Sequence, residues 1–151
     1  MKHNPRRCGA ALGSVLVILA LSLVVVPGAA ARKAWDQETV TGLAAQLAEA
    51  TKALEKTLRR EPHLVQATQG GNRNAVGLWE AMNRLKKATA QLQTRTAAGA
   101  GYEATLPIAK KIRTLVRDAK QRGARLLKTE TMDAKIAPVQ ALLDRLAPYY
   151  F

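Results

Sequence analysis

The chain has 151 residues and a formal net charge of +13, from 24 Lys and Arg against 11 Asp and Glu. This length is typical of one domain, and a content of 48% hydrophobic and 23% charged residues excludes wholesale disorder. Aromatic residues make up 4% of the chain, and Ala is abundant, which favours helices over a β-sandwich.

The first 31 residues have the order of a secretory signal peptide. Three basic residues precede an uncharged stretch, residues 9–31, whose centre is almost entirely Leu, Val, Ile and Ala. Small residues end this stretch at Ala31. A basic start, an apolar core and a small-residue end predict cleavage after Ala31. We therefore expect a signal peptide, residues 1–31, and a periplasmic or secreted domain, residues 32–151.

A retained signal anchor is the alternative, because residues 9–31 reach ~30 Å as a helix, enough to span a bilayer. Pro27 near the far end favours cleavage instead. In both cases the domain lies outside the cytoplasm, since the basic end stays inside. The Arg6-Arg7 pair is a feature of twin-arginine export, but the following Cys8-Gly9-Ala10 does not resemble the rest of that motif, and the apolar core is more hydrophobic than such signals usually have. Cys8 precedes the apolar core, whereas a lipidated cysteine would follow it.

Residues 32–151 lack most residue types on which catalytic and metal sites are built. They contain no Cys, no Ser and a single histidine, His63. Ser and Cys nucleophiles, Cys–His zinc sites and covalent haem attachment are therefore excluded. No Gly-rich phosphate loop is present. The acids lie singly, mostly beside Lys or Arg, so we expect no enzyme, no cofactor and no metal.

Apolar residues recur at alternating spacings of three and four along residues 35–60, which predicts a first helix. Pro62 ends or kinks it, and residues 63–69 have room for a short helical turn. A glycine pair then precedes a second helix over residues 75–96, with Asn74 as its N-cap. The apolar faces of the two helices are Val40, Leu43, Leu47, Ala50, Leu54 and Leu58, and then Leu78, Met82, Leu85, Thr89 and Leu92.

Two further helices are expected in the C-terminal half. The third spans residues 107–128, and the fourth follows Thr129 or Thr131, either of which is suited to cap it. Pro138 kinks the fourth helix or marks a late start, and Pro148 stops it. Their apolar faces are Ile112, Leu115, Val116, Ala119, Gly123, Leu126 and Leu127, and then Met132, Ile136, Val139, Leu143 and Leu146.

Four helices with one apolar stripe each bury these stripes best against one another, and short connections favour antiparallel neighbours. The sequence therefore predicts an all-α, up-down-up-down four-helix bundle preceded by a signal peptide or signal anchor. An export signal followed by four helices resembles small exported bundles such as the periplasmic cytochromes of the c-prime type. The motif for covalent haem attachment is missing, and the resemblance assigns no residue.

The third predicted helix carries the strongest charge. Its bases face only Glu103 and Asp118, which gives a local net charge of +6, and they cover roughly 200° of the helix circumference. We expect them to contact an anionic partner, namely anionic lipid, lipopolysaccharide or an acidic protein. Export and the lack of interleaved aromatic residues argue against nucleic acid. The alternative is an ordinary solvated helix face. The bases are Lys110, Lys111, Arg113, Arg117, Lys120, Arg122, Arg125 and Lys128.

These features favour a non-enzymatic exported protein with a binding, adaptor or envelope role. A second hypothesis is a carrier of a cofactor or small ligand near Trp79, Met82 and Met132, with His63 as a further haem ligand. A third is an enzyme that uses two carboxylates. The simpler interpretation places the tryptophan and methionines in the core and the histidine at the surface. The final residues 149–151, Tyr-Tyr-Phe, would cap the open end of the bundle or offer a small interaction patch.

Overall fold

The computed structural model describes residues 32–151, which form five helices and no strand. The all-helical prediction is confirmed. The expected count of four is wrong, because the residues after Glu61 form a helix of their own. The predicted signal peptide or anchor lies outside the described residues. The helices are α1 (Gln37–Arg59), α2 (Pro62–Gln69), α3 (Arg73–Ala97), α4 (Tyr102–Gly123) and α5 (Thr129–Tyr150).

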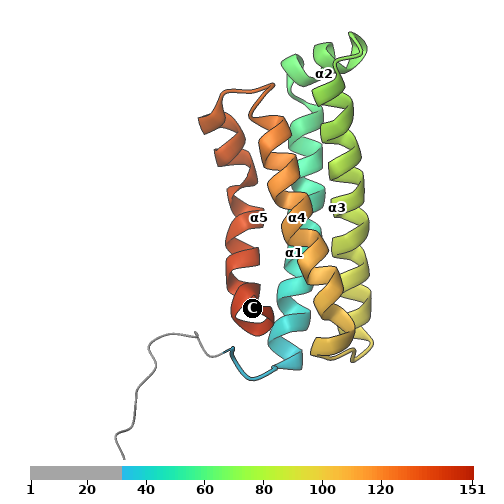
Figure 1. Cartoon of the computed structure of the whole chain (residues 1–151), viewed down its shortest axis with the longest axis vertical. Coiled ribbons are helices and arrows are strands. Elements are labelled where there is room, and N and C mark those ends of the chain that lie inside the picture. Colours follow the sequence, from blue (N-terminus) through green and yellow to red (C-terminus); the bar gives the residue numbers. More distant parts are fainter. Residues whose placement is uncertain (1–31) are drawn as a thin grey trace, which may run out of the picture. The chain divides into compact units, whose positions relative to one another are not determined.

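The four long helices lie side by side, and each runs antiparallel to the long helix before it (Figure 1). α3 packs most extensively on α4, α1 contacts α3 and α5, and α4 completes the ring by packing on α5. The short helix α2 lies at one end, against α1 and α3. Within residues 32–151, no helix is both long and apolar enough to cross a membrane.

The core consists largely of the apolar stripes that the sequence predicts. Every residue of the predicted α3 face is buried, and in α1 only Ala50 of the predicted face stays partly exposed. Leu143 on α5 and Leu126 after α4 are also only partly buried. Full burial of a Leu or Ile side chain contributes about 1.5–3 kcal/mol, so this stripe packing is the main stabilising term.

Side-chain caps fix the starts of α1 and α3. The Asp36 carboxylate accepts a hydrogen bond from the Thr39 N–H at 3.1 Å and caps α1. Asn72, and not Asn74, caps α3, because its Oδ1 accepts from the Asn74 N–H at 2.9 Å. The glycine break before α3 is turn chemistry. Gly71 has a φ of +67°, a left-handed conformation that glycine adopts without strain.

α4 is displaced by five residues from its predicted span at both ends. It begins at Tyr102 rather than at Pro107, because Thr105 in the added turn is fully buried and accepts a hydrogen bond from Tyr150. It ends at Gly123 rather than at Lys128. At its start, a tertiary contact therefore overrides the local propensities from which the span was predicted.

α5 runs through both of its prolines. It begins at Thr129, and the residue at the N-cap position is Lys128, whose side chain makes no capping hydrogen bond. The prediction that Thr129 or Thr131 caps the helix is therefore wrong. The helix is continuous across Pro138, so the expected late start is wrong. A proline removes one N–H from the helix, which a helix of 22 residues with a buried stripe tolerates.

An aromatic cluster holds the last turn of α5, so Pro148 does not stop the helix as predicted. The ring of Tyr150 is buried, 5.5 Å from that of Trp35 and 6.1 Å from that of Tyr102. The Lys33 N–H also donates to the Pro148 carbonyl at 2.8 Å. Tyr150 closes this end of the bundle, whereas the side chain of Phe151 stays exposed.

α4 and α5 are in close contact where α4 ends. A methyl group on Gly123 would lie 2.4 Å from the sulfur of Met132, a side chain that is fully buried. Gly42, inside α1, provides a matched control because a methyl group there would meet nothing within 4 Å.

We predict opposite effects for the two glycine substitutions. Gly123→Ala should lower the free energy of unfolding by about 1–3 kcal/mol, because the side chain of Met132, which is fully buried, would have to shift. Gly42→Ala should raise it by about 0.5–1 kcal/mol through helix propensity. Urea denaturation followed by circular dichroism measures both. A stabilising Gly123→Ala would show that the two helices are not in close contact there.

Glu55 is the one charged residue of the described chain that is buried. Its carboxylate accepts hydrogen bonds from Lys86 of α3 at 2.8 Å and from Arg59 of α1 at 2.7 Å. The Lys86 and Arg59 hydrogen bonds hold the pKa of Glu55 below its ordinary value of 4.5, although desolvation opposes them. The ion pair between Lys86 and Glu55 thus links α1 to α3.

Because the native pKa of Glu55 is lowered, its contribution to stability is complete above pH 4.5 and declines as the pH falls below that value. Glu55→Gln should therefore lower the free energy of unfolding by about 1–2 kcal/mol at neutral pH. The difference from the wild type should shrink as the pH falls below 4.5. The exposed Glu49→Gln serves as control in the same urea titrations. A difference that is constant with pH would contradict the assignment.

Candidate binding groove between α4 and α5

The bases predicted on the third helix do not form one continuous wall. α4 ends before Arg125 and Lys128, which lie in the connection to α5. Arg122 lies against α3, because its guanidinium occupies the space that a side chain on Gly77 would fill. The same guanidinium donates to Asp118 at 3.0 Å. These three bases are thus separated from the rest.

Four of the remaining bases form a stripe along one side of α4. Lys110, Arg113, Arg117 and Lys120 follow one another at spacings of three, four and three, which places them on the same side of a helix. All four line a groove of about 920 Å³ between α4 and α5. We call them the cationic stripe. Lys111 is exposed but does not line the groove.

The groove has an apolar floor to which three helices contribute. Leu92 of α3 reaches the floor from below, and Ile112 of α4 is fully buried. Asp144 is the one acid among the lining residues, and it comes from α5. One side of the groove is thus cationic and the other nearly neutral. The other lining residues are Ala109, Thr114 and Val116 of α4 and Gln140, Leu143, Leu146, Ala147, Tyr150 and Phe151 from α5 and the chain end.

Most of the cationic stripe is free of ion pairs. Among the ion pairs of residues 32–151, only the one between Lys120 and Asp133, at 3.1 Å, involves the stripe. The Arg113 guanidinium lies 5.0 Å from the centre of the Phe151 ring, a cation–π contact. This contact joins α4 to the end of the chain across the groove. The stripe therefore offers charge that the described part of the chain leaves largely uncompensated.

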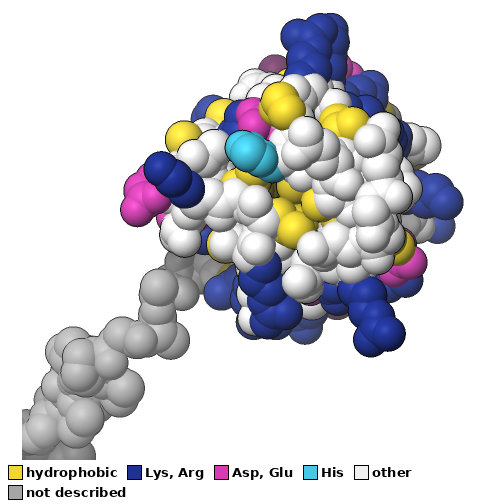
Figure 2. Space-filling model, turned by 90° about the horizontal axis from the view of Figure 1, so that it is seen from above, with side chains coloured by type: hydrophobic (Ala, Val, Ile, Leu, Met, Phe, Trp, Pro, Cys, Tyr) yellow, Lys and Arg dark blue, Asp and Glu magenta, His cyan; other side chains and the backbone are white. Residues whose placement is uncertain are grey.

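The residues of the proposed ligand carrier are engaged elsewhere. Met82 and Met132 are fully buried in the apolar core. The Trp79 indole N–H donates to the Thr68 hydroxyl at 2.9 Å. His63 is exposed on α2, at the end of the molecule seen in Figure 2, where Lys and Arg side chains project on several sides. None of these side chains lines the groove between α4 and α5.

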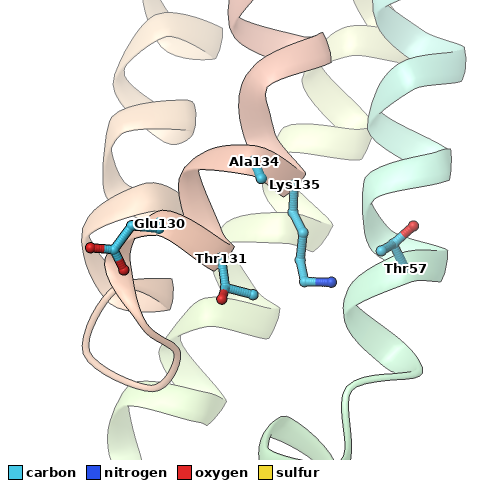
Figure 3. A pocket seen from close by; sticks show the side chains of 5 residues that line it. All are labelled: Thr57, Glu130, Thr131, Ala134 and Lys135. Atoms are coloured by element: carbon cyan, nitrogen blue, oxygen red, sulfur yellow. The ribbon is translucent and has the colours of Figure 1, made fainter.

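A second hollow of about 650 Å³ lies between the end of α1 and the start of α5 (Figure 3). The side chain of Lys135 extends into it from α5, but its amino group is paired with Glu61 at 2.5 Å. Glu130 points away from Thr57 on the opposite wall. With its cation paired and no aliphatic floor, this hollow offers less to a ligand than the groove. It is lined by Thr57, Glu130, Thr131, Ala134 and Lys135.

Hydrogen bonds lower the pKa of two acids in the described chain. Glu55 has a lowered pKa because of Lys86 and Arg59, and Asp36 has a lowered pKa because of hydrogen bonds from Thr39. A general acid that works near neutral pH needs a raised pKa instead. Within residues 32–151, no group of three or more His, Cys, Asp or Glu side chains is arranged to hold a metal ion.

Comparisons of the chain with protein-family models, with curated proteins and with solved structures found no match.

Proposed function

We propose that this protein is a non-enzymatic, exported helical bundle that binds an anionic partner of the cell envelope through the cationic stripe of α4. The observation that carries the proposal is the alignment of four cations beside a groove, with one ion pair among them in the described chain. Residues 1–31 would direct the domain out of the cytoplasm, either as a cleaved signal peptide or as a retained membrane anchor. The exported domain would be the up-down-up-down bundle.

The charge of the stripe is sufficient for a useful affinity. A basic side chain near an anionic membrane surface contributes about 1 kcal/mol, so four of them together raise the binding constant by roughly a thousandfold. This attraction is long-range and screened by salt, with a Debye length of about 8 Å at physiological ionic strength. A partner with several phosphates or carboxylates side by side matches such a row of cations.

Among anionic partners outside the cytoplasm, the phosphate headgroups of lipids suit the stripe best. Arg113 and Arg117 both line the groove, one helical turn apart, and a guanidinium binds phosphate oxygens with two parallel hydrogen bonds. Lipopolysaccharide phosphates present the same chemistry. An acidic protein is the remaining possibility.

We predict that the protein, purified after expression of the full chain, binds anionic phospholipid vesicles and not zwitterionic ones. Reversal of Arg113, Arg117 and Lys120 to Glu should weaken binding at least tenfold, because three attractive contacts become repulsive. Wild-type binding should fall steeply as NaCl rises from about 50 to 300 mM. Vesicle co-sedimentation measures both effects.

A matched variant separates the stripe from the overall charge. Lys56, Lys87 and Arg95 are exposed bases on α1 and α3, and their reversal to Glu changes the net charge by the same amount. This control should retain more affinity than the α4 variant. An equal loss of vesicle affinity in the two variants would refute the stripe as the binding surface. Wild-type affinity that does not change with salt concentration would refute it as well.

The apolar floor also supports a second function, that of a small-ligand carrier. Binding sites for small molecules are mostly apolar hollows of about 300–1,000 Å³ with a few polar groups, a range that includes the groove between α4 and α5. The carrier site would then lie in this groove rather than near Trp79.

A further inference from the structure

We propose that the groove between α4 and α5 binds a single-chain anionic amphiphile, that is, one long alkyl chain with a phosphate or carboxylate head. The inference deepens the proposed function, on which it rests for the role of the cationic stripe. It adds an apolar part to the ligand and a fixed orientation. The ligand is bound as a monomer, which distinguishes it from the leaflet of a membrane.

The floor of the groove supplies the argument for an alkyl chain. Leu143 and Ala147 of α5 line the groove and stay only partly buried, and the side chain of Phe151 is exposed. A purely polar polyanion would gain nothing from these side chains, whereas an alkyl chain removes their exposed apolar surface from water. The groove has a volume of about 920 Å³, which lies within the range of sites that bind drug-sized molecules.

The charges that line the groove set the direction of the ligand. Cations stand only on the α4 side, and the single acid of the lining, Asp144, stands on α5. An anionic head is therefore attracted to Arg113 and Arg117 and repelled by Asp144. A cationic head finds no comparable arrangement, because four cations and one acid line the groove. The charge pattern thus selects an anionic head and places it along α4.

Two aromatic residues, Tyr150 and Phe151, line the groove at the end of α5. Phe151, which is 42% exposed, lies within cation–π distance of Arg113. Its ring lines the groove next to that of Tyr150. An alkyl chain that runs along the floor would bring both rings into contact with it, and the exposed ring would lose contact with water.

The test is isothermal titration calorimetry of the protein, purified after expression of the full chain, with alkyl phosphates and alkyl carboxylates of increasing chain length, each kept below its micelle concentration. We expect the affinity to rise about two- to fourfold per added methylene group, as expected for burial of alkyl surface. Ala147→Trp, which fills the floor, should weaken binding at least tenfold. Ala141→Trp, on an exposed position of α5 outside the groove, should leave it unchanged.

A second pair of variants tests the head. Arg113→Gln combined with Arg117→Gln should weaken binding at least tenfold, whereas Lys111→Gln, on the same helix but outside the groove, should have less than a twofold effect. If Ala147→Trp loses its helical circular dichroism, Thr114→Trp, an exposed residue of the groove lining, replaces it.

The outcomes separate this proposal from the proposed function. One outcome is that the protein binds anionic vesicles, but its affinity for monomeric amphiphile changes neither with alkyl chain length nor with Ala147→Trp. This outcome overturns the amphiphile site and leaves the anionic-surface function standing. Monomer binding without vesicle binding supports the site and overturns the surface function. Absence of both refutes both. A dimer that Ala147→Trp dissociates would also overturn the proposal, because a second copy would then occupy the groove.

Discussion

The packing of α4 against both α3 and α5 is the constraint on which the rest of the structure depends. Toward α3 the contact is close along the helix, and Gly77 leaves room for the guanidinium of Arg122. Toward α5 it is close at Gly123, where Met132 fills the available space. Farther along, Ala147 stands opposite α4 as a small side chain, and a groove remains. The cations of α4, which cannot enter the core unpaired, therefore lie along the groove or in solvent.

The regular part of this fold follows from periodicity in the sequence, whereas the ends of the helices do not. Leu78, Met82 and Leu85 lie on one helical face, and burial of such a face needs only some partner helix. The start of α4 at Tyr102 and the passage of α5 through Pro148 depend on aromatic contacts between residues far apart in the chain. Local propensity holds no information about such contacts.

Of the two sides of the groove, only the α4 side could be predicted from the sequence. The bases of α4 are evident in the sequence, and the spacing of three, four and three from Lys110 to Lys120 would have singled out the stripe within the larger set. The other side of the groove was not predictable, because it depends on which residues of α5 face α4 and how closely they approach. Leu143 was expected in the core, yet it lines the groove and stays partly exposed.

The central claim is that the groove between α4 and α5, and not the positive charge of the whole molecule, is the binding site. A nuclear magnetic resonance titration of ¹⁵N-labelled protein with dodecyl phosphate below its micelle concentration tests it most directly. The account predicts saturable amide shift changes confined to residues 109–120 and 140–151, which include most of the lining of the groove. Shift changes spread over bases on all helices, or centred on α2 and the end of α1, would contradict it.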